Sequence, residues 1–308
     1  MISELGMTEV ADLDRVEGAL AELRGGDHRG SVRATTLNLV AFCESDAHVD
    51  RAQDAITRIG GSRPLRAVVL LPGTGHPRVA VSSSCWAEAD SEVCSEQVLI
   101  RATRDALPSA VVPLLLSDLP AFVWWQGAID MQDEVLVELV ELCDRLIVDS
   151  DEAGVEAVES ITLLPRALSD LAWGRTTPWR EAVAGMFDTP EPLACLDHLV
   201  GVEVAGPTAQ ASLLAGWLRS RLHRQVGLDH TDSAQLHRVS MNCGSAGTFT
   251  VERDGRLAVG TAEGPGLPPH PVVLRHDHIA SLVGGEIYRM GVDHVYEQAL
   301  AAAHGQQP

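Results

Sequence analysis

Between residues 119 and 164 the chain alternates short apolar runs with longer amphipathic segments. The runs 119–125 and 145–148 are short and mainly apolar, which is typical of strands buried on both faces. Residues 133–143 repeat their apolar side chains at helical spacing, and Ser150 is a good N-cap for a second helix that we expect to extend to about residue 164. Strands that alternate with helices of this length predict a mainly parallel α/β sheet.

The residues before 119 fit the same architecture, with an antiparallel section expected around residues 65–101. We predict an initial helix over 7–23 from the apolar spacing. The turn and β-branched patterns further along predict strands at 33–44, 65–71, 78–86 and 93–101, and helices at 49–60 and 108–116.

From residue 165 onward the pattern changes, and a chain of 308 residues is long enough for two domains. We therefore expect an N-terminal domain over 1–164, a mixed, mainly parallel sheet flanked by helices, and a smaller α+β domain over 165–308. In the second domain we predict helical segments at 168–173, 178–187, 211–222, 277–288 and 293–303, strands at 198–204, 235–243, 247–253 and 256–261, and loops at 189–192 and 264–271.

The composition excludes several classes of function. All 23 basic residues are arginine, so lysine-based chemistry such as a Schiff base or a P-loop is absent. A net charge of −20 has the wrong sign for binding nucleic acid or an anionic membrane surface. The acidic N-terminal residues lack the apolar region of a secretory signal, and no apolar run has the length of a membrane helix, so we expect a cytoplasmic protein.

No strong catalytic, cofactor or metal motif is visible. The glycine-rich segment 72–77 lacks the third glycine of a dinucleotide fingerprint and is better explained as a turn. The serine run 82–84 lacks the nucleophile-elbow pattern. His276 and His278 are too close together at a helix start to face one metal ion, so we expect no metal site and no cofactor.

Cys85 and Cys94 lie on consecutive predicted strands around an acidic turn. Facing positions on such strands could bring their Cα atoms within disulfide range. The alternative is a pair of reduced thiols, so the sequence leaves a possible redox pair open.

Two segments concentrate the tryptophans. The first, 117–125, contains Asp118, Trp124 and Trp125, and the second, 170–181, contains Trp173, Arg175, Trp179 and Arg180. Consecutive residues of one strand face opposite sides, so Trp124 and Trp125 cannot both fill one core unless both faces of the sheet are covered. Tryptophan and arginine are enriched at interface hot spots, and cation–π pairing within one domain is the structural alternative. These seven residues are our candidates for partner binding.

These segments give the sequence a family resemblance. The chain resembles the bacterial glucose-6-phosphate dehydrogenase assembly protein family, OpcA. The resemblance rests on RATTLNLVAF (33–42), SRPLR (62–66), CSEQVLIRA (94–102), VVPLLLSDLPAFVWWQG (111–127), LCDRLIVDS (142–150) and DLAWGRTTPWREAVAGMFD (170–188). It implies a non-enzymatic, two-domain cytosolic activator that binds glucose-6-phosphate dehydrogenase and promotes its active oligomer in the NADPH-forming oxidative pentose phosphate pathway. In photosynthetic bacteria the family is also linked to thiol redox control.

A sugar-phosphate-binding enzyme is the alternative. Arg63, Arg66 and Arg78 could clamp a phosphate group, because guanidinium groups match its oxygens. Arginine is a poor base, however, and no obvious base lies beside these residues. Turnover by the purified chain alone would favour the enzyme, whereas dependence on added dehydrogenase would favour the activator.

Overall fold

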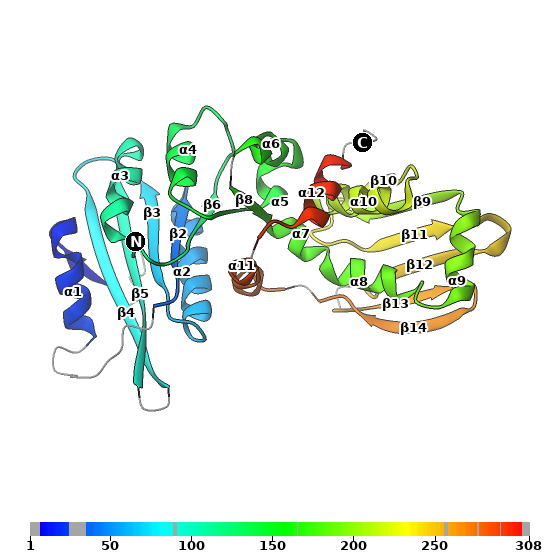
Figure 1. Cartoon of the computed structure of the whole chain (residues 1–308), viewed down its shortest axis with the longest axis horizontal. Helices are drawn as coiled ribbons and strands as arrows, with labels where there is room; N and C mark the ends of the chain where they lie inside the picture. Colours follow the sequence, from blue (N-terminus) through cyan, green and yellow to red (C-terminus); the bar gives the residue numbers. More distant parts are fainter. Residues whose placement is uncertain are drawn as a thin grey trace. The chain divides into compact units, whose positions relative to one another are not determined.

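Two β-sheets organise the chain, and each belongs to a separate compact unit (Figure 1). The computed structural model describes residues 7–24, 35–88, 91–164, 166–255, 258–275, 277–289 and 291–303. The first unit contains residues up to 148 together with 161–169 and 279–291, and the second contains 149–160, 170–278 and the residues from 292 onward.

The first sheet has eight strands in the order β1-β4-β5-β3-β2-β6-β7-β8. The five strands from β5 to β7 run parallel, β4 pairs antiparallel with β5, and β1 pairs antiparallel with β4. The strands are β1 (Thr8–Val10), β2 (Asn38–Cys43), β3 (Arg66–Pro72), β4 (Arg78–Glu88), β5 (Ser91–Ala102), β6 (Ala121–Gln126), β7 (Arg145–Val148) and β8 (Ala167–Asp170).

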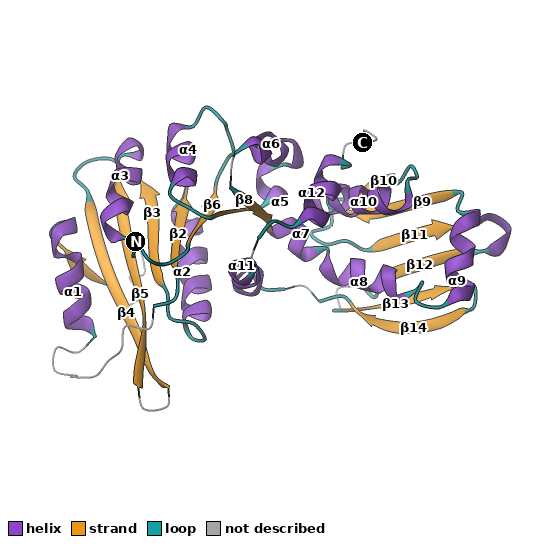
Figure 2. Ribbon diagram, viewed as in Figure 1, coloured by secondary structure: helices purple, strands orange, loops and turns teal. Residues whose placement is uncertain are grey.

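Helices cover both faces of this sheet, so its central strands are buried along their whole length (Figure 2). One face packs against α2, and the other against α3 and α4. The helices of the first unit are α1 (Val16–Leu23), α2 (Asp46–Gly60), α3 (Leu107–Val111), α4 (Glu134–Glu141) and α11 (Ile279–Tyr288), with 3-10 turns at Leu13–Arg15, Arg104–Ala106, Val112–Leu114 and Ile161–Leu163.

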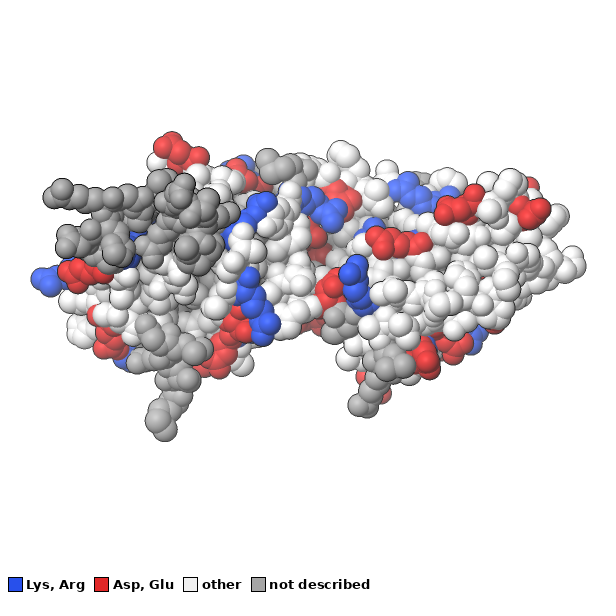
Figure 3. All heavy atoms as spheres, turned by 90° about the horizontal axis from the view of Figure 1, so that it is seen from below, with Lys and Arg blue, Asp and Glu red and all other residues white. Residues whose placement is uncertain are grey.

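The second sheet has six strands in the order β10-β9-β11-β12-β13-β14 and is antiparallel except for β10 and β9. One face holds the apolar core, which includes Val204, Phe249 and Val251, while the other face is polar and exposed. Much of the surface of this unit seen in Figure 3 is uncharged. Its strands are β9 (Gly201–Gly206), β10 (Gly227–His230), β11 (Arg238–Asn242), β12 (Thr248–Arg253), β13 (Val259–Gly264) and β14 (Leu267–Val273).

Helices pack on the apolar face of the second sheet. α10 contacts β9 and β10, and α8 contacts β12 and β14. The helices of this unit are α5 (Ser150–Ala153), α6 (Val155–Ser160), α7 (Leu171–Arg175), α8 (Thr177–Gly185), α9 (Pro190–Cys195), α10 (Thr208–Leu222) and α12 (His294–Ala301), with 3-10 turns at Leu196–His198 and Gly244–Ala246.

The predicted α/β class is confirmed, with a mixed, mainly parallel first sheet and a second α+β unit. Three expected elements are wrong in type. Part of the predicted helix 7–23 is strand β1, which pairs with the edge of β4. The helix predicted at 168–173 begins only at Leu171, because Asp170 caps it. The loop expected at 264–271 contains β14. This strand lies at the edge of the sheet, where proline is tolerated at positions whose backbone N–H would face solvent and would make no hydrogen bond within the sheet.

Smaller differences have local causes. Gly154 has a positive φ of 86° and divides the helix predicted at 150–164 into α5 and α6, and the N-cap of α5 is Asp149 in place of Ser150. Helix α9 occupies the predicted loop 189–192, and β10 was not expected. His276 and the start of the predicted strand 256–261 lie outside the described residues.

No single boundary in the sequence separates the two compact units. The division expected between residues 164 and 165 stays a prediction about sequence domains, since residues 149–160 belong to the second unit and 279–291 to the first. In the part of the chain that the structure describes, we find no helix with the length and apolar character needed to cross a bilayer.

Candidate functional site

The adjacent tryptophans of β6 point to opposite faces of the first sheet, as expected, and both are buried. The Trp125 ring stacks on Phe42 with ring centroids 3.9 Å apart, and its Nε1 donates to the carbonyl of Ala128 at 3.0 Å. On the other face, the guanidinium of Arg51 from α2 lies 6.0 Å from the Trp124 ring. Helices on both faces therefore explain how two consecutive indoles are accommodated.

The tryptophans of the second segment are also buried, 2% exposed for Trp173 and 1% for Trp179. The Trp173 Nε1 donates to the Asp293 carboxylate at 3.2 Å, and the Arg180 guanidinium lies 3.6 Å above its ring. Trp179 belongs to the core of the second unit. The internal cation–π pairing that the sequence left open is thus present.

The polar candidates differ in accessibility. Arg175 binds Asp149 with two parallel hydrogen bonds of 2.7 and 2.8 Å and donates to Asp151 at 3.0 Å. Arg180 is half-buried and donates to the hydroxyls of Thr176 and Thr177.

Asp118 is exposed in the turn before β6. The four candidate tryptophan rings are all buried in this structure. Residue type alone does not distinguish a core indole from an interface indole. Partner binding by the two tryptophan segments stays a prediction.

Asp170 is a buried acid that the sequence analysis missed. Its carboxylate accepts the backbone N–H of Ser150 at 3.0 Å and of Ala172 at 2.9 Å, and the hydroxyl of Tyr296 donates to it at 3.3 Å. Burial raises the pKa of Asp170 to about 7, and the nearby charge of Asp149 adds to that rise, while the backbone hydrogen bond from Ser150 opposes it. An aspartate just before a helix was the available sequence signal.

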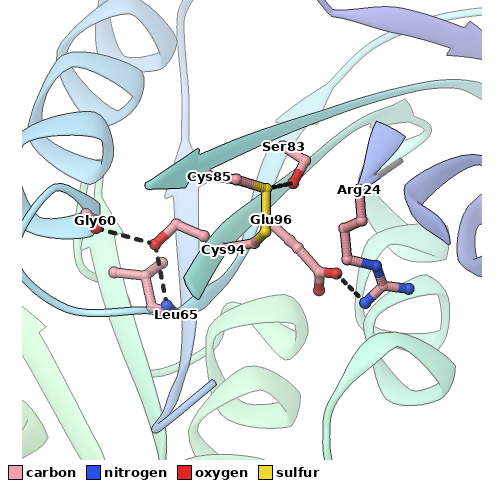
Figure 4. The surroundings of a disulfide bond; sticks show 8 residues. Arg24, Gly60, Leu65, Ser83, Cys85, Cys94 and Glu96 are labelled. Atoms are coloured by element: carbon pink, nitrogen blue, oxygen red, sulfur yellow. Dashed lines mark hydrogen bonds and ion pairs between the residues drawn. A yellow bond between two sulfur atoms is a disulfide. The ribbon is translucent and has the colours of Figure 1, made fainter. Parts of the chain in front are cut away.

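Cys85 and Cys94 lie directly opposite each other on β4 and β5 and form a disulfide with a Cα–Cα distance of 4.1 Å (Figure 4). Cys85 is exposed and Cys94 is buried. Among the remaining cysteines, burial raises the pKa of both Cys43 and Cys143 to about 12, which keeps these thiols unreactive. Redox activity of the bridged pair stays a prediction.

The point where strand order reverses in the first sheet lies between β2 and β6, and in open α/β sheets this crevice is where nucleotides bind. Here Glu44 follows β2, and its side chain is exposed at this edge. A Cβ added to Gly127, which follows β6, would lie 2.5 Å from the Glu44 side chain, and the backbone N–H of Ala128 donates to the Glu44 carboxylate at 3.3 Å. The Glu44 carboxylate thus accepts the backbone N–H of Ala128, which a phosphate group bound here would otherwise accept.

Arg104 also lies at this edge. Its guanidinium pairs with Asp133, lies 3.9 Å from the Glu44 carboxylate and sits 4.8 Å from the Phe42 ring. Arg104 is therefore already neutralised by two carboxylates, which disfavours the binding of a pyrophosphate through this guanidinium.

The arginine clamp proposed from the sequence is not assembled. Arg66 is fully buried and donates to Glu96 and Glu17, both at 2.7 Å. Arg63 stacks on the Tyr288 ring, and Arg78 pairs with a carboxylate on β1. Within the described residues, no cluster of three or more histidine, cysteine or acidic side chains is arranged to hold a metal ion.

The chain is thus a two-unit α/β protein in which the side chains of Glu44 and Arg104 line the sheet edge where open α/β folds bind nucleotides. Family models described as the N-terminal and the C-terminal domain of a glucose-6-phosphate dehydrogenase subunit match residues 56–163 and 166–300. The chain belongs to this family, OpcA.

Curated relatives agree with the family. The chain is 32% identical over 179 residues to "Putative OxPP cycle protein OpcA" of Nostoc punctiforme and 29% identical over 181 residues to the protein of the same name from Synechocystis. Each match covers 53% of this chain and 38% of the relative. The match thus spans less than half the length of these relatives.

Solved structures resemble the chain only distantly. An oxidoreductase from Sinorhizobium meliloti has a TM-score of 0.43 and 9% identity over 86% of both chains. A levoglucosan dehydrogenase bound to NADH and L-sorbose has a TM-score of 0.43 and 10% identity over 88% of both chains. Nothing about function follows from these two likenesses.

Proposed function

We propose that this chain is a non-enzymatic assembly factor that binds glucose-6-phosphate dehydrogenase and promotes its active oligomer. Its family membership supports a role with that enzyme in the oxidative pentose phosphate pathway. The observation that carries the non-enzymatic part is the Glu44 side chain packed against Gly127, where a nucleotide phosphate would bind. The cytoplasmic location expected from the sequence belongs to the same proposal.

The partner-binding residues we propose lie in both units: Asp118 in the first, in the segment that contains the buried Trp124 and Trp125, and Arg175 and Arg180 in the second, in the segment that contains the buried Trp173 and Trp179. The Arg180 guanidinium is held over the Trp173 ring and by two threonine hydroxyls, so little side-chain entropy is lost when it contacts a partner. A preorganised arginine of this kind is suited to an interface hot spot.

Co-purification with the host dehydrogenase, followed by its kinetics with and without the chain, tests the proposal. We expect stable co-elution, a shift of the dehydrogenase to a larger oligomer, and NADPH formation that depends on the dehydrogenase. The chain alone should form no NADPH from glucose 6-phosphate.

The Glu44→Ala variant adds a sharper control, since it opens the crevice without supplying a glycine-rich loop. It should still produce no NADPH by itself. Turnover by the wild-type chain free of contaminating enzyme, or unchanged dehydrogenase kinetics and oligomeric state in its presence, would contradict the proposal.

A further inference from the structure

An open surface pocket lies in the first unit where β1, β4 and β5 meet helix α2. It is separate from the crevice between β2 and β6. Its walls include Met7, Gln53, Arg78, Ala80, Leu99 and Arg101. Ala80 lies opposite Leu99 on the neighbouring strand, and the small alanine side chain leaves space for the pocket.

Two arginines lie side by side in this pocket. Arg78 of β4 and Arg101 of β5 are direct cross-strand partners, so their side chains leave the sheet on the same face. Like charges in such a position repel each other and destabilise the strand pair unless an anion compensates them.

The compensating carboxylates are weakly held. Glu9 pairs with Arg78, and Asp46 pairs with Arg101 at 2.6 Å. The side chains of these two acids are 61% and 65% exposed. Exposed ion pairs of this kind contribute little to stability, so an anion entering the pocket can replace them at low cost.

Gln53 supplies a third polar group, and it is only 9% exposed. Within the described residues, its carboxamide makes one hydrogen bond, from Nε2 to the thioether of Met7 at 3.1 Å. A thioether is a weak acceptor, so this buried amide lacks a strong partner although it lines the pocket. An oxygen-rich ligand would supply one.

We propose that this pocket binds a small organic anion, with Arg78 and Arg101 contacting its phosphate or carboxylate group and Gln53 contacting a neighbouring hydroxyl. Leu99, Ala80 and Met7 provide apolar contact for the carbon skeleton. The inference does not depend on the proposed function, because it rests on the pocket alone.

Calorimetric titration of the full chain tests the site with four probes: inorganic phosphate, glucose 6-phosphate, gluconate and uncharged glucose. We expect saturable binding of at least one organic anion and none of glucose. A phosphate-specific site would bind glucose 6-phosphate over gluconate, and a carboxylate-specific site would show the reverse order.

Variants locate the binding. Arg101→Gln and Gln53→Leu should each weaken it about tenfold or more, because each removes a hydrogen bond to an anionic or oxygen-rich ligand. Arg58→Gln is the matched control, since Arg58 is an exposed arginine of α2 paired with Asp54 away from the pocket lining. The proposal is overturned if no organic anion binds saturably, if glucose binds equally well, or if Arg101→Gln and Gln53→Leu both bind like the wild type.

Discussion

Asp170 shows how a single buried carboxyl group connects several elements of the second unit. It caps α7, accepts the amide of Ser150 at the start of α5, and receives the hydroxyl of Tyr296 from α12. Few positions hold three donors around one acid. Because burial raises its pKa to about 7, its protonation state differs between the folded and unfolded chain.

We predict that Asp170→Asn changes the pH dependence of stability. A folded pKa of about 7 against an ordinary value of about 3.9 means that the folded chain retains a proton between these pH values while the unfolded chain has lost it. The wild-type free energy of unfolding should therefore fall as pH rises from about 4 to about 7, by up to about 1.4 kcal/mol per pH unit for this group. Asparagine keeps the capping oxygen but does not titrate.

Urea unfolding of both proteins at several pH values between 4 and 8 measures this effect. The stability of the wild type relative to Asp170→Asn should decrease across the range and level off above about pH 7. Parallel curves for the two proteins would show that Asp170 titrates normally.

Substituting a buried tryptophan and substituting Arg180 should have different effects on stability and on dehydrogenase binding. Trp179 lies in a core, so Trp179→Ala should lower the free energy of unfolding by about 3–5 kcal/mol. Arg180→Ala removes contacts with the Trp173 ring and two threonine hydroxyls, so it should lower the melting temperature, though less than Trp179→Ala does. It should weaken dehydrogenase binding by about 2 kcal/mol, close to 30-fold.

Arg221→Ala is the control for charge, because Arg221 is an exposed arginine of α10 in the same unit. Thermal melts and a binding titration with the dehydrogenase separate the effects. Wild-type affinity in Arg180→Ala would place the partner elsewhere.

At the scale of elements, two helical glycines have opposite surroundings. A Cβ added to Gly216 of α10 would lie 2.0 Å from the carbonyl oxygen of Ala299 in α12, so these helices approach closely only because the residue is glycine. A Cβ added to Gly285 of α11 meets no atom within 4 Å.

We predict that Gly216→Ala destabilises the chain by about 1–3 kcal/mol through overpacking. Gly285→Ala should stabilise it by up to about 1 kcal/mol, because alanine favours the helix and restricts the unfolded chain. Chemical denaturation of the two variants gives the comparison. Equal effects of the same sign would mean that α10 and α12 are not in close contact.

The disulfide fastens the outer part of the β4–β5 hairpin. Cys85 is exposed, so a reductant can reach the bond, and a bridge closing so short a loop contributes about 2–3 kcal/mol in the chain-entropy model. We predict that reduction, or Cys85→Ser, speeds amide hydrogen exchange at Ser84 and Ser95 but not in the buried strand β3.

Exchange measured by mass spectrometry on the oxidised and reduced chain tests this prediction, with β3 as the internal control. The same two samples, added to the dehydrogenase, test whether activation responds to redox conditions. Identical activation in both would remove the regulatory role while leaving the structural one.

The elements predicted most accurately from the sequence are those that their own local residue pattern determines. The runs that became β6 and β7 and the amphipathic α4 were placed within about two residues, because burial on both faces and helical spacing are local signals. β1 and β14 were missed because each is an edge strand formed by pairing with a distant partner. The same holds for the candidate site. The tryptophan segments could be identified from the sequence, but their burial could not, because it depends on helices from elsewhere in the chain.

At the scale of the whole molecule, the path of the chain links the two units repeatedly. It passes from one unit to the other after residues 148, 160, 169, 278 and 291. Each sheet thus depends on segments that lie beyond the predicted boundary at residue 164. In the first unit, α11 packs on α2, the Tyr288 ring lies under Arg63, and Arg145 of β7 donates to the carbonyl of Arg289 at 3.0 Å.

We therefore predict that fragments 1–164 and 165–308 do not fold independently. The first lacks α11, which packs on α2, and it lacks the Ser169 hydroxyl and the Arg289 carbonyl to which Arg145 donates at 2.8 and 3.0 Å in the full chain. The second lacks α5, so Asp170 loses the Ser150 amide and Arg175 loses the Asp149 carboxylate.

Each fragment should bind a hydrophobic dye, lose near-UV circular dichroism and melt without a cooperative transition, whereas the full chain melts cooperatively under the same conditions. Cooperative melting of both fragments would show that the boundary at residue 164 divides two independently stable domains, and that the exchanged segments contribute little to either core.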